Sequence, residues 1–304
     1  MEVFITGGSG FVGRALCQGL LALGHAVTVL TRSAQGASRL PAGVGSCLGD
    51  PGHPGPWQDE AARCQAFINL AGASVFQRWT DQAKHQILES RVSGTRHLVQ
   101  AMARGGSPPT AVLISASAVG YYGFHGDEEL DEHAPAGDDF LAHVCQQWES
   151  QAMEAETLGA RVVRARFGIV LGDRGGALEK MLPIFRLGLG GVLGGGRQWF
   201  SWIHQLDLVN ALLWCLQHPE ARGAVNCTAP QPVTNHDMAK ALGRALHRPV
   251  FLPVPGLAIQ LALGEFGTVL TQGQRVLPRR LQAMGFEFAF PAIGPALADL
   301  MGRG

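Results

Sequence analysis

The sequence predicts an α/β fold: a Rossmann-type, doubly wound parallel sheet with a smaller C-terminal lobe that holds the substrate. Short apolar runs alternate with amphipathic helical patterns through the first half of the 304 residues. The first of these runs leads directly into a glycine-rich segment, TGGSGFVG at 6–13. After Gly168 the alternation gives way to glycine-rich and proline-rich segments. Alternating strands and helices are typical of a parallel sheet that helices cover on both faces.

The periodicity of the apolar residues gives the order of the elements. Strands are predicted at 2–6, 26–31, 66–70, 111–116 and 161–167, with a further strand before Asp50. Helices are predicted at 11–23, 80–104, 140–158, 207–217, 235–247, 256–271 and 274–284, and a ligand-facing loop at 187–196. We therefore assign 1–170 and 205–230 to the nucleotide-binding domain, and 171–204 and 231–304 to the smaller lobe.

Composition excludes several classes of protein. Lys+Arg and Asp+Glu number 24 each, so no net charge attracts nucleic acid or an anionic membrane. The six cysteines are scattered with no C-x-x-C pair, which argues against a metal site and a disulfide framework. No signal peptide or membrane-spanning stretch is visible. We expect a cytoplasmic protein with no nucleic-acid or membrane partner.

The glycine-rich segment has the spacing of a dinucleotide-binding loop. Gly7, Gly10 and Gly13 stand between a strand and an amphipathic helix. One glycine allows the tight turn, one lets the backbone approach the pyrophosphate, and one allows close packing of helix and strand. An ordinary glycine turn is the alternative. The predicted cofactor-binding residues of this loop are Thr6, Gly7, Gly8, Ser9, Gly10, Phe11, Val12 and Gly13.

The end of the second strand indicates which cofactor is bound. Arg32 stands about twenty residues after the loop, where an NAD-selective protein carries an acidic residue. Arginine pairs instead with a 2′-phosphate, so NADP(H) is favoured, although an exposed loop arginine is the alternative. Asp50 either contacts the adenine or makes a turn. Asn69, Leu70, Ala71 and Gly72 close a further strand with mostly small residues, either against the cofactor or as a simple turn.

These segments resemble the extended short-chain dehydrogenase/reductases, the NAD-dependent epimerase/dehydratase family. The resemblance is closest to an atypical, sugar-nucleotide epimerase-like subfamily with a C-terminal domain of unknown function, here about 250–296. It rests on the segments TGGSGFVG, NLAG, RVSGT, ISASA, VCQQWE, RFGIVLG, LGLGGVLGGGRQWFSWIH and GFEFAFP. The resemblance also implies cofactor-binding roles for Arg91, Ser115, Ala116 and Arg166.

The chain departs from this family in its chemistry. Family members use a Tyr-x-x-x-Lys pair, in which lysine holds the nicotinamide ribose and makes tyrosine an acid or base near neutral pH. Here the two positions fall near Leu141 and Cys145. No tyrosine stands four residues before any lysine: Thr80 precedes Lys84, Gly176 precedes Lys180, and His236 precedes Lys240.

Other residues are candidates for the missing roles. Ser117 matches the family's catalytic serine, and Tyr121 and Tyr122, the only tyrosines, follow it. We assign these three as candidate catalytic residues, with packing beneath the loop as the alternative for the tyrosines. Cys145 is more typical of a buried apolar residue than of a nucleophile.

Two further clusters lead to expectations about contacts. We expect Glu149 to pair with an arginine, with Arg91 as the candidate partner, either as a structural ion pair or to orient a ligand. His204 is expected to hold its loop to Asp207, with binding to a ligand as the alternative. The neighbouring Trp199, Phe200 and Trp202 either line a substrate pocket or pack in the core.

Three functions remain. The favoured one is an NADP(H)-dependent oxidoreductase or epimerase-like enzyme with a non-standard active site and a small-molecule substrate; family resemblance alone suggests a nucleotide sugar. The alternative is a non-catalytic NADP(H)-binding sensor or scaffold. An interaction module without nucleotide is disfavoured by the intact glycines. A homodimer through 80–104 and 140–158 is a further possibility.

Overall fold

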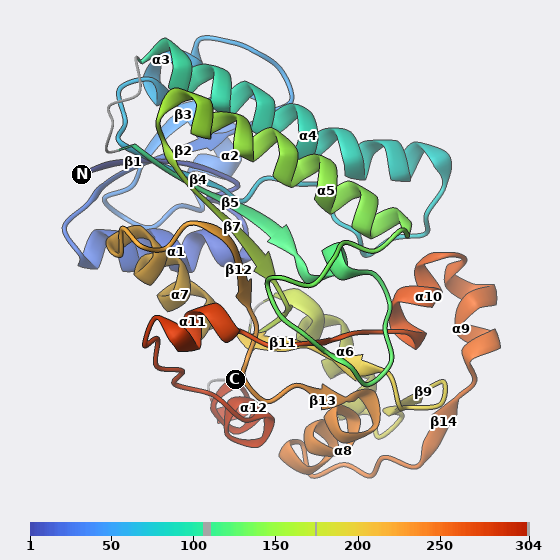
Figure 1. Cartoon of the computed structure of the whole chain (residues 1–304). Helices are drawn as coiled ribbons and strands as arrows, with labels where there is room; N and C mark the ends of the chain where they lie inside the picture. The colour runs from blue at the N-terminus through green and yellow to red at the C-terminus, as the bar shows by residue number, and fades with distance from the viewer. Residues whose placement is uncertain (106–110, 174, 303–304) are drawn as a thin grey trace.

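The computed structural model describes residues 1–105, 111–173 and 175–302. Its centre is a seven-stranded, wholly parallel sheet of order β12-β7-β5-β4-β1-β2-β3 (Figure 1). The strands are β1 (Glu2–Thr6), β2 (Ala26–Thr31), β3 (Gly45–Leu48), β4 (Ala66–Asn69), β5 (Val112–Ala118), β7 (Arg161–Phe167) and β12 (Gly223–Cys227). The chain winds outward from β1 to β3 and then returns to β4 on the other side of β1. This reversal confirms the doubly wound fold and leaves a crevice at the carboxyl ends of β1 and β4.

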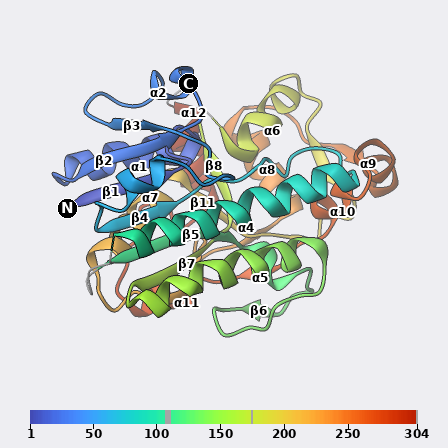
Figure 2. The same ribbon diagram turned by 90° about the horizontal axis from the view of Figure 1, so that it is seen from above.

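Helices cover both faces of the sheet (Figures 1 and 2). One face carries α1 (Phe11–Ala22) and α7 (Gln205–Gln217), which contact each other. Their buried leucines, including Leu16 and Leu212, share a core with alternate residues of β1, β4 and β5. The other face carries α3 (Trp57–Ala61), α4 (Asp81–Arg104) and α5 (Phe140–Met153), while the short α2 (Ala34–Ala37) follows β2.

The C-terminal lobe has its own apolar core. Its helices are α6 (Gly176–Arg186), α8 (Asn235–Ala245), α9 (Gly256–Leu263), α10 (Phe266–Thr271) and α12 (Ile293–Gly302). Phe185, Trp202, Met238 and Leu297 are buried together in this core. Four two-stranded pairs complete the structure: β8 (Ile169–Gly172) with β11 (Trp202–His204), β9 (Gly191–Leu193) with β14 (Leu252–Val254), β10 (Trp199–Phe200) with β13 (Val233–Thr234), and β6 (Glu129–Leu130) with β15 (Arg275–Val276).

Three predicted helices were too long. The 140–158 helix ends at Met153 and continues as a 3-10 helix, Glu154–Leu158. The 256–271 helix is interrupted at Gly264, whose φ of +64° lies in the left-handed region, giving α9 and α10. The 274–284 segment begins as β15, and only α11 (Arg279–Ala283) after Pro278 is helical. The predicted loop at 187–196 contains β9.

The domain division stays a prediction, and its ranges include 106–110, 174 and 303–304, which lie outside the described residues. Residues 205–230 were assigned to the nucleotide-binding domain, and the two elements they contain fit this: β12 is a strand of the parallel sheet, and α7 packs against the sheet with α1. Conversely, Leu281 of α11 packs in the core beneath the sheet, so the C-terminal segment is not confined to the smaller lobe.

The pair α4 and α5, proposed above for dimerisation, packs side by side over the sheet (Figure 2). Among large apolar side chains of the two helices, only Met153 is exposed in the described part of the chain. The dimer therefore remains a prediction without an apolar patch to support it. No helix among the described residues is both long and apolar enough to cross a membrane.

Candidate functional site

The turn from β1 into α1 packs closely against the backbone that follows β4, against the first turn of α1 and against β2. Gly7 has φ +73°, and a Cβ there would lie 2.7 Å from the carbonyl carbon of Leu70. A Cβ on Gly13 would lie 2.5 Å from the carbonyl oxygen of Gly7, and one on Gly8 would strike the side chain of Val29. Glycine is therefore required at these positions by packing alone. The loop is a narrow cradle walled by the end of β4.

The first turn of α1 faces this cradle with free backbone donors. Gly10 caps the helix with φ −77° and contributes no side-chain hydrogen bond. The first N–H groups of a helix have no intrahelical acceptor, and the helix dipole adds positive potential there. Donors of this kind suit the pyrophosphate of a dinucleotide. Phe11 instead directs its ring at the lobe, where a Cβ on Gly172 would lie 2.4 Å from its Cζ.

Asn69 connects the strands below the cradle. Its Oδ1 accepts a hydrogen bond from Thr6 Oγ1 at 2.6 Å, and its Nδ2 donates to Thr95 Oγ1 on α4 and to Ser115 Oγ on β5. All four side chains are buried. Thus Thr6, Asn69 and Ser115, predicted at the cofactor, fix the relative positions of β1, β4 and β5. Ala116 lies beside them, buried in β5.

Arg32 is exposed directly after β2 and forms no salt bridge among the described residues. The next residue, Ser33, caps α2 by accepting a hydrogen bond from the Gly36 N–H. The Arg32 guanidinium is therefore available to a ligand at the edge of the crevice. Asp50 makes a turn, accepting a hydrogen bond from the Gly52 N–H at 2.9 Å.

Arg91 lies under the segment that follows β4. Its Nη1 donates to the carbonyl oxygens of Ala73 and Ile87, each at 3.0 Å. A Cβ on Gly72 would lie 3.0 Å from the guanidinium carbon, which itself stands 5.1 Å from the centre of the Trp148 ring. The predicted pairing of Arg91 with Glu149 was wrong, because the Arg91 hydrogen bonds hold the backbone after β4 to α4 instead.

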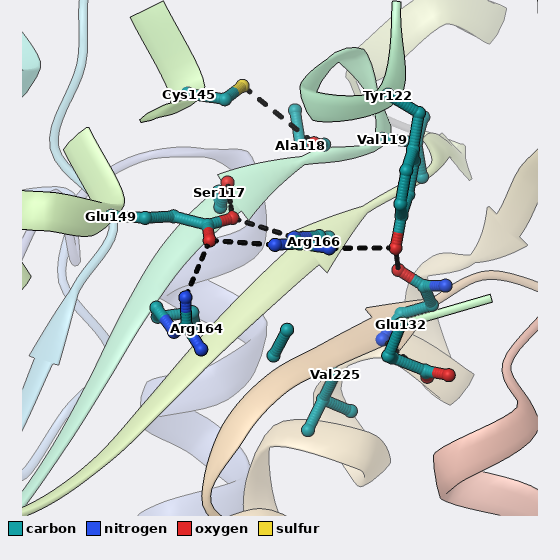
Figure 3. A network of polar contacts seen from close by, with 12 residues as sticks. Ser117, Ala118, Val119, Tyr122, Glu132, Cys145, Glu149, Arg164, Arg166 and Val225 are labelled. Atoms are coloured by element: carbon teal, nitrogen blue, oxygen red, sulfur yellow. Dashed lines mark hydrogen bonds and ion pairs between the residues drawn. The ribbon is translucent and has the colours of Figure 1, made fainter. Parts of the chain in front are cut away.

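Glu149 is the centre of a buried charge cluster (Figure 3). Its Oε1 accepts from Arg166 Nε at 2.7 Å, and its Oε2 accepts from Arg166 Nη2 at 2.9 Å and from Arg164 Nη1 at 3.1 Å. Ser117 Oγ also donates to Oε1, at 2.8 Å. The Glu149 and Arg166 side chains are each 3% exposed. Burial opposes the charge on Arg166, but the hydrogen bonds and charge of Glu149, with a smaller contribution from Tyr122, together outweigh burial and raise the pKa of Arg166.

Tyr122 extends this cluster into the core (Figure 3). Its hydroxyl accepts from Arg166 Nη1 at 2.9 Å and donates to Asn226 Oδ1 at 2.6 Å. The side chain is fully buried, and burial raises the pKa of Tyr122 to about 12. The Tyr122 hydroxyl therefore serves the core, because it is buried and its one hydrogen bond as a donor goes to Asn226.

Tyr121 is less buried than Tyr122. Its half-buried ring packs on Arg166, whose guanidinium carbon is 3.4 Å from the ring centre. Its hydroxyl is neither hydrogen-bonded nor fully enclosed in the described structure. Ser117 lies in β5 as predicted, but its hydroxyl hydrogen is already used in the hydrogen bond to Glu149. Of the three candidate catalytic residues, Tyr121 alone has a proton available to a ligand.

Apolar side chains occupy the positions of the family's catalytic pair. Leu141 and Cys145 lie on α5, with the Cys145 Sγ 3.7 Å from the carbonyl oxygen of Ala118. Burial raises the pKa of Cys145 to about 11, which leaves the thiol neutral and unreactive. No cluster of metal-binding side chains occurs among the described residues.

His204 and Asp207 hold the C-terminal segment rather than each other, so the predicted contact between them was wrong. The Nδ1 of His204 accepts from the Leu206 N–H at the start of α7, and its Nε2 is 3.3 Å from Asp299 Oδ2. Asp207 accepts the N–H groups of Ala289 and Phe290 at 2.8 and 2.9 Å.

The three tryptophan and phenylalanine residues near His204 have separate environments. Trp202 is fully buried in the core of the lobe. Phe200 is partly buried and packs against that core. Trp199 is partly exposed, and its indole Nε1 donates to Asp127 Oδ1 at 2.8 Å.

The fold, the glycine cradle and the free helix N-terminus define a dinucleotide-binding protein of the Rossmann class. Residues 3–227 match the NAD dependent epimerase/dehydratase family, and 254–300 match a domain of unknown function. The chain belongs to the NAD dependent epimerase/dehydratase family, and the C-terminal match confirms the expected subfamily.

Three relatives illustrate the similarity. The chloroplastic epimerase family protein SDR39U1 homolog of Arabidopsis thaliana is 43% identical, covering 99% of this chain and 87% of its own length. The crystal structure of human SDR39U1 with NADPH is 35% identical with a TM-score of 0.86, covering 100% of both chains. A Corynebacterium glutamicum structure, described as a nucleoside-diphosphate sugar epimerase, is 35% identical with a TM-score of 0.78; the match covers 100% of this chain and 58% of that one.

Replacing Glu149 with glutamine should destabilise the protein strongly. The variant keeps the shape of the side chain but leaves the buried Arg166 without its counter-charge. Breaking a buried ion pair costs about 3–5 kcal/mol. Urea denaturation should show this loss, whereas Glu60→Gln, which breaks an exposed pair with Arg63, should cost under about 1 kcal/mol. Equal, small effects of the two substitutions would contradict a structural role for the cluster.

Tyr122 should make the stability of the protein fall at alkaline pH. The phenol ionises near pH 10 when the chain is unfolded but only near 12 in the folded state. Its contribution is therefore complete below pH 10 and is lost as the pH rises toward 12, by an amount of the order of 2 kcal/mol. Unfolding free energies across this range should fall less steeply for Tyr122→Phe than for wild type. A Tyr121→Phe control should follow wild type; a wild-type slope in Tyr122→Phe would refute the assignment.

Proposed function

We propose that the chain binds NADP(H) along its glycine loop and acts as an oxidoreductase or epimerase-like enzyme with a non-standard active site. The observation that carries the proposal is the cradle around Gly7, where a Cβ would occupy the space between the loop and Leu70. The free N–H groups of α1 would hold the pyrophosphate. NADPH in the human relative supports the same cofactor for this chain.

Arg32 would select NADP(H) over NAD(H). It is exposed and forms no salt bridge in the described structure, so its five donors are available to a 2′-phosphate. No acidic residue stands at the end of β2 to accept a hydrogen bond from a ribose 2′-hydroxyl. The adjacent Ser33 holds α2 in place, which fixes the backbone from which Arg32 extends.

Tyr121 would be the acid or base. The bound nicotinamide supplies or accepts a hydride, and such a reaction requires a proton to move at the substrate. Tyr121 follows β5 at the carboxyl edge of the sheet, where ligands of doubly wound folds bind. Arg166, fixed by Glu149, packs on the ring and determines its orientation. Ser117, whose hydroxyl already donates a hydrogen bond to Glu149, could act toward the substrate only as a hydrogen-bond acceptor.

The substrate would be a small molecule held between the sheet edge and the lobe. The description of the Corynebacterium glutamicum relative supports a nucleotide sugar, in keeping with the family resemblance. A non-catalytic NADP(H) sensor is the second candidate. Leu141 and the buried Cys145 favour it, because neither can perform the proton transfer of the family's usual pair.

Replacing Arg32 with alanine should weaken NADPH binding and leave NADH binding unchanged. Hydrogen bonds to a charged group contribute about 1.5–3 kcal/mol, which corresponds to roughly 10-fold to 150-fold in affinity. Calorimetric titration of both cofactors would measure the difference. Arg63→Ala, which removes an exposed arginine just after the end of α3, serves as the control. Equal losses for NADPH and NADH would overturn the 2′-phosphate assignment.

Tyr121→Phe should abolish turnover without changing NADPH affinity. The assay follows NADPH absorbance when the protein meets the small-molecule fraction of a cell extract. Loss of a general acid typically lowers the rate by about 10²–10⁴-fold. Wild type with tight NADPH binding but no absorbance change would favour a sensor or a redox-neutral epimerase. Full activity in Tyr121→Phe would eliminate Tyr121 as the acid or base.

A further inference from the structure

Large apolar side chains are exposed where α6 ends and β14 begins. Leu187 is 74% exposed and Phe251 is 70% exposed. Three apolar side chains close to them in the sequence are also exposed: Ile184, Leu189 and Leu252. The two segments lie side by side, because β9 and β14 pair with Gly191 opposite Leu252. We call these five side chains the apolar ridge.

A basic cluster borders the apolar ridge. Lys240 and Arg244 stand one turn apart on α8, and with His247 and Arg248 they line one open pocket. The Arg248 Nε donates to the carbonyl oxygen of Arg186 at 2.9 Å, which joins the cluster directly to the end of α6. All of these basic side chains are exposed.

The basic side chains of this cluster are not held in salt bridges. None of Lys240, Arg244 and Arg248 forms a salt bridge with an acidic side chain among the described residues. The acidic residue on the same helix, Asp237, lies one turn before Lys240 and interacts with its charge, but its side-chain hydrogen bonds go to Thr234 and His236. The basic cluster and the apolar ridge thus form one surface, positively charged on one side and apolar on the other.

We propose that this surface docks on an anionic lipid bilayer. Exposed leucine and phenylalanine side chains beside arginine and lysine match the boundary between acyl chains and anionic headgroups. Charge complementarity favours this partner over a second copy of the chain. In a two-fold symmetric dimer the same patch meets itself, so a second copy would bring further basic side chains instead of the negative charge that anionic headgroups supply.

The location of the surface is compatible with docking. Helix α8 and strand β14 lie at the end of the molecule opposite α3 (Figure 1). The proposal does not depend on the proposed cofactor or reaction. It also differs from the expectation of no membrane partner, since a net charge of zero does not exclude a local basic cluster.

The test is cosedimentation of the full chain with vesicles. One set contains phosphatidylcholine alone, and the other contains phosphatidylcholine mixed with phosphatidylglycerol. Wild type should bind only the anionic set, and more weakly at high salt. Arg244→Glu/Arg248→Glu should lower the partition by roughly 30-fold or more, since each basic residue near the surface adds about 1 kcal/mol, or about fivefold. Leu187→Ser/Phe251→Ser should also lower it.

Arg96→Glu/Arg222→Glu is the matched control, because it reverses the same charge at exposed arginines elsewhere. It should bind as wild type does, and thermal melting verifies that every variant is folded. The proposal is overturned if wild type does not bind anionic vesicles. It is also overturned if Arg96→Glu/Arg222→Glu lowers binding as much as Arg244→Glu/Arg248→Glu does. A dimer in sedimentation that Leu187→Ser/Phe251→Ser dissolves would also overturn it, assigning the surface to a second copy of the chain.

Discussion

The close approach of the backbone at Gly7 to the end of β4 is the constraint on which the structure depends. A Cβ at Gly7 would stand 2.7 Å from the Leu70 carbonyl carbon, so only glycine lets β1 turn away here while β4 passes beside it. This contact lies where the winding of the sheet reverses. It also aims the N-terminus of α1 into the crevice. Asn69 accepts a hydrogen bond from Thr6 and donates one to Ser115, and these bonds keep the three strands in register beneath the contact.

The carboxyl edge of the sheet is organised by burying charge instead of presenting a reactive pair. Glu149 gathers Arg164, Arg166 and Ser117, and the cluster is linked to the core through Tyr122. A buried ion pair is stable only when its remaining donors and acceptors are satisfied. The hydroxyl groups of Ser117 and Tyr122 help to meet this requirement by hydrogen-bonding to Glu149 and Arg166. The half-buried Tyr121, stacked on Arg166, keeps a hydroxyl that is not hydrogen-bonded in the described structure.

Local signals in the sequence predicted the sheet apart from its edge strand β12, the long helices that cover it and the glycine loop, because each depends on short-range periodicity and spacing. The contacts of Glu149 could not be predicted in this way. They depend on the register that sets Ser117 opposite Arg166 across β5 and β7, which a single sequence does not specify. The helices of the lobe were predicted too long because Gly264 and Pro278 interrupt apolar patterns that otherwise continue. Whole-chain charge likewise concealed the uneven placement of basic residues.

The most direct test of the account is the thermal stabilisation of wild type and Gly10→Asp by NADPH. Gly10 has φ −77°, and its Cβ would meet only the Gly7 carbonyl oxygen, at 3.1 Å, so aspartate should fold there. Its carboxylate would place negative charge where the pyrophosphate binds. The account predicts equal melting temperatures without ligand and stabilisation of wild type alone, by about 2.7 kcal/mol when NADPH is at a hundred times its Kd. Equal stabilisation of both proteins, or of neither, would contradict cofactor binding at this loop.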